Sequence, residues 1–311
     1  MPELQVGERR WTVASGSNLL DSLNQAGIAV PYSCRAGSCH ACLVRCITGE
    51  PADALPEALD PVKRLQGWRL ACQCRVIDDL AVQAFDPLCD GAPARVAGCD
   101  WLSPAVLRLR LEPERPLRYR AGQHLVLWTA SGVARPYSLA SLPGEDPYLE
   151  FHLDCRQPGA FVDAARQLEI GDSIGLGELR GGALQYDPDW QEQPLLLLGA
   201  GTGLGPLWGV LREALRQDHQ GPIRLIHLAR DGGEHYLRTE LTELAGNHGV
   251  QVQLVTADEL EATLADLRML SRKTMALVCG SPQSVETFAK RLYLAGIPRN
   301  QVLADVFVGR D

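Results

Sequence analysis

The stretch Cys34-Arg35-Ala36-Gly37-Ser38-Cys39-His40-Ala41-Cys42 sets three cysteines in the pattern C-x4-C-x2-C, and 29 residues separate Cys42 from a more distant cysteine, Cys72. One type of [2Fe-2S] loop has this spacing, with a distant fourth cysteine. Three thiolates can reach one small inorganic core from a single tight loop only if most residues between them are small, and here they are. Backbone N–H groups of such a loop can then donate to the cluster sulfurs. The stretch therefore predicts Cys34, Cys39 and Cys42 as iron ligands.

A structural zinc site is the alternative interpretation of these cysteines. Zinc ribbons use two C-x2-C pairs separated by about 15 to 20 residues, whereas only Cys39 and Cys42 form such a pair here. The spacing thus favours iron and sulfur over zinc. Cys72 and Cys74 both remain candidates for the fourth ligand on spacing alone. His40 is not expected to bind iron, because histidine-ligated clusters need two histidines.

Length and charge narrow the class of protein. The chain has 311 residues, which predicts two or three domains at about 100 to 200 residues each. Acidic residues outnumber basic ones, 38 against 30, which gives a net charge of −8 and argues against nucleic acid or an anionic membrane as partner. The start MPELQVGERRW lacks the pattern of a signal peptide, and no apolar run approaches the roughly 18 residues of a membrane span. We therefore expect a cytoplasmic protein.

Residues 1–88 are expected to form a small α+β unit around the cysteine loop. Ser17 is the expected N-cap of a helix that ends at Gly27. The turn-rich stretch 86–93 marks the end of this unit. Strands are expected at Leu4–Val6, Trp11–Val13, Leu43–Ile47 and Leu80–Ala84.

Two further units follow, at residues 94–189 and 190–311. Short strands with Gly and Pro turns predict an antiparallel barrel in the first, with one helix at Phe161–Leu168. Alternating strands and helices predict a parallel, doubly wound sheet in the second. The barrel strands are expected at Ala94–Leu102, Val106–Leu111, His124–Trp128, Tyr148–Leu153 and Ser173–Leu176. The parallel strands are expected at Leu195–Leu198, Ile223–Leu228, Val250–Val255 and Met275–Val278.

A four-residue motif in the barrel unit, Arg135-Pro136-Tyr137-Ser138, resembles the R-x-Y-[ST] flavin motif of the ferredoxin-NADP reductase family. The resemblance implies that Arg135 pairs with a flavin phosphate, that Tyr137 stacks on the isoalloxazine, and that Ser138 reaches toward its N5. Pro136 belongs to the same flavin-binding segment. Taken alone, the motif is also compatible with an ordinary barrel strand that has a half-buried tyrosine.

The segment Gly159-Ala160-Phe161-Val162 lies where that family has G-x-x-[ST], a loop that enters a helix and holds the flavin pyrophosphate. Gly159, Ala160 and Phe161 are therefore expected at the flavin, and the resemblance implies FAD rather than FMN. Val162 replaces the hydroxyl residue of the family pattern, so one side-chain contact to phosphate is missing.

The third unit carries a glycine-rich turn between a buried strand and a helix, the arrangement that binds a dinucleotide pyrophosphate. Its residues resemble the family's nicotinamide loop. Cys279-Gly280-Ser281-Pro282 resembles the family's C-G-x-P, which implies that Cys279 lies near the nicotinamide ring; a buried strand end is the alternative. Phe307 is expected to cover the flavin face, although a strand at Val302–Val308 would also bury it. The loop residues expected to bind are Gly201, Thr202, Gly203, Gly205 and Pro206.

Four motifs in this order, namely the cysteine loop, the flavin motif, the glycine-rich turn and C-G-x-P, together resemble the reductase components of bacterial ring-hydroxylating dioxygenases and multicomponent monooxygenases, of the benzoate dioxygenase reductase type. The resemblance implies a β-grasp ferredoxin domain, an antiparallel β-barrel flavin domain and an α/β doubly wound nucleotide-binding domain. Gly67–Cys72 is similar to the strand that delivers the last cluster ligand, which implies Cys72 as a ligand and Cys74 and Cys46 as non-ligands.

The expected activity follows from the electron count. A nicotinamide gives up two electrons as a hydride, a [2Fe-2S] cluster takes one, and a flavin can exchange both. The resemblance implies an NADH-dependent reductase, with NADPH left open, that delivers electrons to a partner oxygenase. A reductase of the same build for a deoxysugar dehydratase or another acceptor is the second hypothesis. A non-enzymatic redox sensor is the third, and it would not need the nicotinamide loop.

Overall fold

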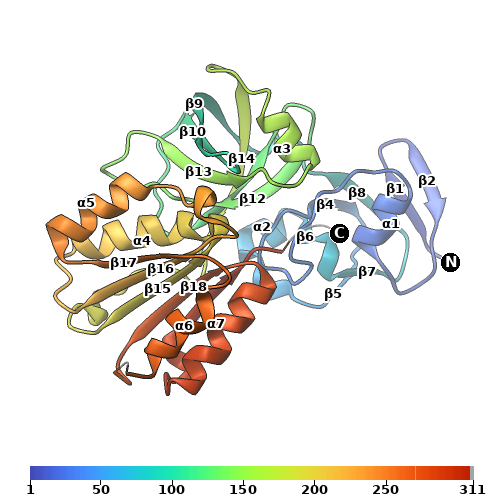
Figure 1. Ribbon diagram of the computed structural model, residues 1–311. Coiled ribbons are helices and arrows are strands. Elements are labelled where there is room, and N and C mark those ends of the chain that lie inside the picture. Colours follow the sequence, from blue (N-terminus) through green and yellow to red (C-terminus); the bar gives the residue numbers. More distant parts are fainter. Residues whose placement is uncertain (270, 309–311) are drawn as a thin grey trace.

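Three units, each built around its own sheet, follow one another along the chain in the computed structural model, which describes residues 1–269 and 271–308 (Figure 1). The first is α+β, the second an antiparallel barrel, and the third a parallel sheet with helices on both faces. This is the fold class expected from the sequence, which is confirmed. Among the described residues, no helix combines the length and the apolar character that a bilayer span requires.

The first unit packs one helix, α1 (Leu19–Gln25), on a mixed sheet of order β2-β1-β8-β4-β6. Its core is rich in leucine, with Leu4, Leu20 and Leu23 almost fully buried. A short helix, α2 (Pro61–Leu65), lies on the connection to β6, and a small sheet of order β3-β7-β5 lies beside the main one. The strands are β1 (Glu3–Val6), β2 (Arg9–Thr12), β3 (Ser17–Asn18), β4 (Leu43–Thr48), β5 (Ala52–Asp53), β6 (Trp68–Leu70), β7 (Cys74–Val76) and β8 (Leu80–Ala84).

The N-cap of α1 differs from the expected one. Ser17 pairs with Val76 in the small sheet, so its backbone is already committed to a strand. Asn18 is the N-cap instead, and its side-chain oxygen accepts a hydrogen bond from the N–H of Asp21. Asparagine and serine are about equally good N-caps, so the pairing with β7 decides between two adjacent candidates.

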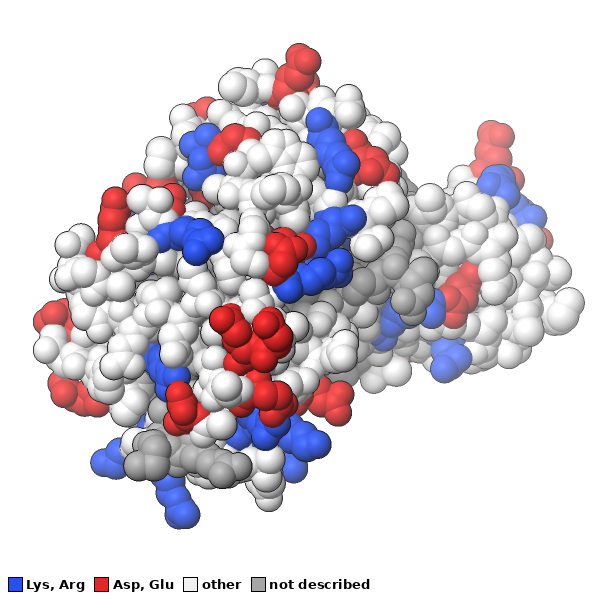
Figure 2. All heavy atoms as spheres, in the orientation of Figure 1, with Lys and Arg blue, Asp and Glu red and all other residues white. Residues whose placement is uncertain are grey.

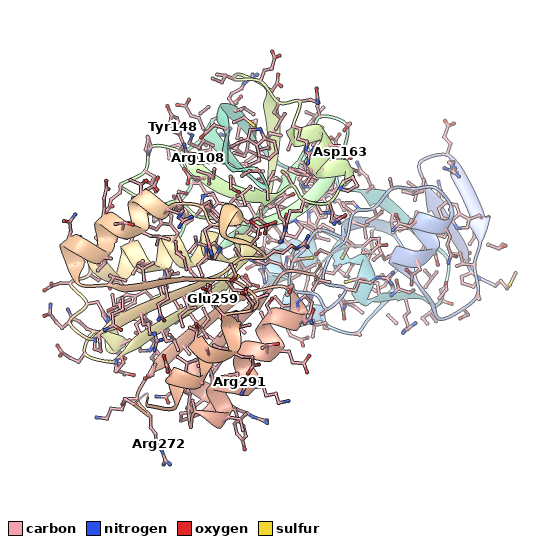
Figure 3. The ribbon with its side chains drawn as sticks, in the orientation of Figure 1. Arg108, Tyr148, Asp163, Glu259, Arg272 and Arg291 are labelled. Atoms are coloured by element: carbon pink, nitrogen blue, oxygen red, sulfur yellow. The ribbon has the colours of Figure 1, made fainter. Side chains whose placement is uncertain are left out.

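The second unit is a six-stranded antiparallel sheet of order β12-β11-β14-β9-β10-β13. A bridge between Leu139 and Phe151 brings the two ends of this order together, which curls the sheet into a barrel. Arg108, labelled in Figure 3, pairs with Asp100 across β10 and β9. The strands are β9 (Ala92–Ser103), β10 (Val106–Pro113), β11 (His124–Trp128), β12 (Ala134–Ser138), β13 (Leu149–Asp154) and β14 (Ser173–Arg180).

The barrel helix, α3 (Ala160–Ala165), is shorter than the expected Phe161–Leu168. After Ala165, the N–H groups of Gln167 and Leu168 bond three residues back instead of four, so the chain tightens into a turn. The apolar pattern at Leu168 reflects packing against the barrel core and not a further helical turn.

The third unit is a fully parallel sheet of order β17-β16-β15-β18-β19. Helices α4 and α5 cover one face and α6 and α7 the other (Figure 1). Arg291 on α7, labelled in Figure 3, forms an ion pair with Glu261 on α6. The elements are β15 (Leu195–Ala200), α4 (Leu204–Arg216), β16 (Ile223–Leu228), α5 (Arg238–His248), β17 (Gln251–Val255), α6 (Leu260–Ala265), β18 (Met275–Gly280), α7 (Pro282–Leu294) and β19 (Val302–Val306).

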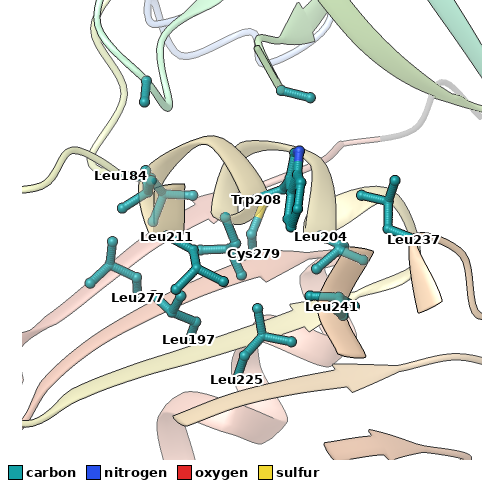
Figure 4. Packing of buried hydrophobic residues seen from close by; sticks show 14 of the residues in the cluster. Leu184, Leu197, Leu204, Trp208, Leu211, Leu225, Leu237, Leu241, Leu277 and Cys279 are labelled. Atoms are coloured by element: carbon teal, nitrogen blue, oxygen red, sulfur yellow. The ribbon is translucent and has the colours of Figure 1, made fainter. Parts of the chain in front are cut away.

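Helix α4 packs closely on this sheet and so holds the glycine-rich turn between β15 and α4 in place. Leu204 and Leu211 of α4 are fully buried, as are the sheet residues Leu197, Leu225 and Leu277 (Figure 4). Cys279 lies among them. Because every residue of β15 up to Gly199 is buried, the turn after it is held against a rigid support.

Candidate functional site

One cleft of about 730 Å³ opens where the three units meet. The first unit contributes its cysteine loop, the barrel contributes β12, and the third unit contributes the glycine-rich turn and the end of β19. Motifs more than 160 residues apart in the sequence, such as Cys39 and Gly201, thus line one space. The predicted site residues that line it are Cys34, Cys39, Arg135, Pro136, Tyr137, Ser138, Gly201, Thr202, Gly205, Pro206 and Phe307.

The cysteine loop is tightly wound. Arg35 and His40 adopt positive φ angles of 51° and 56°, and Gly37 one of 82°. A Cβ on Gly37 would lie 2.7 Å from Cδ2 of Leu55, so only glycine fits without a shift of that side chain. The winding turns backbone N–H groups inward, and those of Ala36 and Cys39 both lie 3.3 Å from Sγ of Cys34.

Four thiols converge on this loop in two pairs. The Cys39 thiol hydrogen-bonds the sulfur of Cys34 and lowers its pKa to about 4, and the Cys42 thiol does the same for Cys72 and lowers its pKa to about 7. Among the described residues, no three His, Cys, Asp or Glu side chains gather as tightly as one metal ion needs. Two pairs are what a [2Fe-2S] cluster requires, since each iron takes two protein ligands. The donor set therefore fits the cluster.

The neighbouring cysteines lie elsewhere. Cys74 is fully buried in the apolar core of the first unit, and Cys46 is half-buried on β4, where burial raises its pKa to about 11. The side chain that approaches Cys42 is therefore that of Cys72 and not that of Cys74. His40 is not at the surface: only 2% of it is exposed, and its Nδ1 lies 2.5 Å from Oε2 of Glu178 on β14.

The flavin motif occupies β12, at the edge of the barrel that faces the cysteine loop. Arg135 donates from Nη1 to the carbonyl of Tyr32, 3.1 Å away, in the first unit. The ring of Tyr137 lies 5.0 Å from that of Phe161, and burial raises the pKa of its hydroxyl. Arg135, Tyr137 and Ser138 all line the cleft, so the arrangement can offer a cation, an aromatic face and a hydroxyl to one bound molecule.

The predicted phosphate segment at α3 is placed differently. Gly159, Ala160 and Phe161 do not line the cleft. Phe161 is 2% exposed and packs in the barrel core behind Tyr137, so its evident contribution is to hold that ring in place. A direct role of these three residues in cofactor binding stays a prediction.

The glycine-rich turn approaches β18 closely. A Cβ on Gly203 would lie 2.3 Å from the carbonyl oxygen of Cys279, so a side chain there would displace the backbone. His227, fully buried on β16, donates from Nε2 to the carbonyl of Gly201 at 3.0 Å. Burial lowers the pKa of His227 to about 3, so the ring is neutral and its second nitrogen can accept from His235.

Cys279 and Gly280, predicted next to the nicotinamide, do not themselves line the cleft, and neither does Gly203. The Cys279 side chain is fully buried under α4, and burial raises its pKa (Figure 4). Gly280 accepts from the N–H of Phe307 at 2.8 Å, which brings the half-buried Phe307 to the cleft. The proposed contact of Cys279 with a nicotinamide ring stays a prediction.

Several cleft residues had no motif to reveal them. His124 lies opposite Ser138 in the β11–β12 register, and its Nε2 is buried with no hydrogen-bond partner among the described residues. Burial lowers the pKa of His124 to about 4, so the ring is neutral. Asp305 on β19 is also in the cleft, and burial raises its pKa. The sequence signal for both was only their place next to a recognised motif or strand end.

Three domain families match the chain in the order of the three units. Residues 4–76 match the 2Fe-2S iron-sulfur cluster binding domain, residues 102–183 the oxidoreductase FAD-binding domain, and residues 197–291 the oxidoreductase NAD-binding domain. These matches agree with the cysteine loop, the flavin motif and the glycine-rich turn.

Whole proteins resemble the chain over nearly its full length. The reductase component of the naphthalene 1,2-dioxygenase system of Pseudomonas putida is 30% identical, over 98% of this chain and 97% of its own. The reductase subunit of an aromatic O-demethylase of an Amycolatopsis species is 30% identical over 92% of each chain. The solved Amycolatopsis cytochrome P450 reductase GcoB superposes with a TM-score of 0.67, at 27% identity and 99% coverage of both chains. The chain belongs to the ferredoxin–NAD(P)⁺ reductase family of oxygenase reductase components, which are iron–sulfur flavoproteins with separate [2Fe-2S], FAD and NAD domains.

Proposed function

We propose that this chain carries electrons from NADH through a flavin and a [2Fe-2S] cluster to an oxygenase. The observation that carries the proposal is the shared cleft. It is lined by Cys34 and Cys39, by the flavin motif and by the glycine-rich turn. One NADH supplies two electrons and yields NAD⁺ and a proton, so two one-electron acceptors are reduced per NADH. When bound, the flavin accepts both electrons together and releases them singly.

The predicted site residues fall into three sets, one for the cluster, one for the flavin and one for the nicotinamide. Cys34, Cys39, Cys42 and Cys72 would bind the cluster, a proposal supported by their two-plus-two arrangement. Arg135 would pair with the flavin phosphate, while Pro136, Tyr137 and Ser138 would hold the isoalloxazine, with Ser138 nearest the reacting nitrogen. The glycine-rich turn, with Cys279 and Gly280 behind it, would hold the nicotinamide end, and Phe307 would cover the flavin face.

The choice of NADH rests on the segment after β16. Arg230 lines the cleft and could meet a 2′-phosphate, but Asp231 and Glu234 follow closely and would repel one. Glu234 is also engaged by Arg156 at 3.3 Å. We expect kcat/KM to favour NADH. A kcat/KM ratio that favours NADPH tenfold would reverse this assignment, and the proposed path from flavin to cluster to partner would still hold.

The proposed domains are residues 1–88 for the ferredoxin domain, 94–189 for the flavin domain and 190–311 for the nucleotide domain. All three family matches fall inside these bounds, which supports them. We also propose the cytoplasm as the compartment, because none of the ten cysteines, all of which the structure describes, forms a disulfide, and disulfides are rare where the surroundings are reducing.

An oxygenase is the proposed acceptor because both protein relatives compared above carry oxygenase or demethylase names. A nucleic-acid partner is not favoured, since basic and acidic side chains lie interspersed over the face shown in Figure 2. The discriminating observation is the identity of the genes next to this one. A neighbouring dehydratase in place of an oxygenase would favour the second hypothesis.

The test of the electron path uses the purified holoprotein. It should contain two irons, two acid-labile sulfides and one flavin, and heat release followed by chromatography should identify the flavin as FAD. With NADH it should reduce a one-electron acceptor steadily, two per NADH. Stoichiometric zinc without iron, or the absence of NADH oxidation, would contradict the proposal.

A further inference from the structure

One largely buried carboxylate joins the first unit to the barrel. Glu178 on β14 receives His40 at Oε2, 2.5 Å away, and Lys63 at Oε1, 3.1 Å away. Only 13% of the Glu178 side chain is exposed, and none of the His40 side chain. Burial raises the pKa of Glu178, but the hydrogen bond from His40 and the charge of Lys63 outweigh it and hold the pKa at about 2. Glu178 is therefore an anion with two partners from another unit.

The position of His40 gives this contact its significance. His40 lies directly between Cys39 and Ala41, so it is part of the tight loop whose thiols converge. Its positive φ of 56° means that the loop does not relax freely around it. A carboxylate that fixes the His40 ring thus fixes the loop, and with it the Cys34–Cys39 edge that faces the cleft.

Apolar packing also joins the first unit to the barrel but does not by itself set the orientation of the cysteine loop. Phe85 stacks on Trp128 with ring centroids 4.9 Å apart, and Cys39 and Ala41 pack against Val126 of the barrel. Such contacts hold surfaces together without strong directional preference. The Glu178 carboxylate restricts the orientation of the first unit relative to the barrel, because each of its oxygens interacts with a different side chain of that unit and hydrogen bonds are directional.

We propose that Glu178 is a positioning residue that orients the cluster loop of the first unit toward the flavin motif, through His40 and Lys63. This inference rests on the proposed electron path and adds a determinant of its internal step. Electron transfer between two groups depends steeply on their separation and orientation, so loosening the loop should slow that step. The hydride step would depend on the flavin motif and the glycine-rich turn, neither of which contacts Glu178, so its rate should not change.

The main experiment compares Glu178→Ala and Glu178→Gln with the unaltered holoprotein in stopped flow. Flavin reduction by NADH should keep its rate in both variants. Cluster reduction, followed at its own visible absorption and by electron paramagnetic resonance, should slow about tenfold or more in Glu178→Ala. Glu178→Gln should lie between, because its amide oxygen can still accept one hydrogen bond.

A structural readout independent of turnover accompanies the kinetics. Hydrogen exchange at residues 31–42 and 126–136 should rise in Glu178→Ala, since the first segment carries His40 and the second packs against Cys39 and Ala41. Glu114→Ala is the matched control, because Glu114 is on the same barrel but pairs with Arg95 at the surface. It should change neither exchange in these segments nor cluster reduction.

Lys63→Met provides a second route if Glu178→Ala loses its cluster during purification. It removes one partner of Glu178 from α2 and leaves the cysteine loop untouched, and it should slow cluster reduction less than Glu178→Ala does. Unchanged exchange and unchanged cluster reduction in these variants would overturn the proposal. Failure of the electron path itself has a different signature, namely that NADH does not reduce the flavin even in the unaltered protein.

Discussion

At the residue scale, two cysteines two positions apart have opposite surroundings. The thiol of Cys72 lies against that of Cys42 and receives a hydrogen bond from Nε2 of Gln73 at 3.3 Å. The thiol of Cys74 is fully buried among apolar side chains on β7. One position is thus suited to a metal ligand and the other to packing, which makes serine substitutions at the two sites a direct comparison.

We expect Cys72→Ser to lose or badly perturb the cluster, because a hydroxyl is a poorer iron ligand than a thiolate. Cys74→Ser should keep the cluster but lower stability by roughly 1 to 3 kcal/mol, because it buries a hydroxyl in an apolar core. Iron and sulfide analysis and visible absorption measure the first effect, and denaturation measures the second. A cluster lost from the Cys74 variant and kept in the Cys72 variant would place the fourth ligand two residues further on.

A second prediction concerns Cys279. Alanine at this position removes the sulfur that packs behind the nucleotide turn, so the turn should hold the nicotinamide ring less firmly. Flavin reduction by NADH should slow by about tenfold, equivalent to ~1.4 kcal/mol, with flavin and cluster contents unchanged. Stopped-flow absorption gives the rate. Unaltered hydride transfer would assign the buried thiol to core packing alone.

What the sequence could predict at this scale depends on whether a residue belongs to a local pattern. Cys34, Cys39 and Cys42 share one loop, so their spacing alone pointed to a common metal. The spacing left Cys72 and Cys74 open, because the loop does not determine which of two neighbours turns inward. Glu178 had no pattern at all, since its partners are more than 100 residues away.

At the element scale, the bounds of several strands of five or six residues were predicted correctly. The expected and observed bounds of Ile223–Leu228 agree fully, and so do those of His124–Trp128 and Leu80–Ala84. The short strands β3, β5 and β7 were not expected, because two or three residues carry no period and form only through pairing with each other. Pairing also moved the N-cap from Ser17 to Asn18.

The glycine-rich turn leads to a third prediction. Gly203→Ala would set a Cβ 2.3 Å from the Cys279 carbonyl and push the turn away from β18. We expect KM for NADH to rise about tenfold or more, with cluster and flavin retained. Gly232→Ala is the matched control in the same unit, because a Cβ there meets no atom within 4 Å. Steady-state kinetics on both variants separates crowding at the turn from a general effect of losing a glycine.

At the scale of the whole molecule, the order of three units was predictable from the motifs, but their mutual packing was not. The cleft depends on which face of the first unit meets the barrel. The orientation of the first unit on the barrel depends on contacts made by side chains such as Phe85, Trp128 and Glu178. In the sequence, nothing distinguishes these three residues from ordinary core or surface residues. Such contacts follow from complementary surfaces, and a linear pattern does not encode them.

A fourth prediction separates the two halves of the electron path. The main apolar core of the first unit is separate from the cores beneath the flavin and nucleotide motifs, so loss of the cluster in Cys72→Ser should leave flavin and nucleotide binding intact. NADH should still reduce ferricyanide through the flavin in this variant, while reduction of the natural protein partner should collapse. Parallel assays with the two acceptors measure both outcomes. Full reduction of the partner without a cluster would contradict the proposed electron order.

The contact between the cysteine loop and the barrel has a consequence for how the rate depends on dilution. Because both sides belong to one chain, transfer between them is a first-order step, and its rate constant does not change when the protein is diluted. Electron delivery to a separate partner is a bimolecular encounter, so its rate falls in proportion as the partner's concentration falls. When the partner is dilute, the reduced form of the chain therefore accumulates. The supply of partner, and not the supply of NADH, then sets the flux.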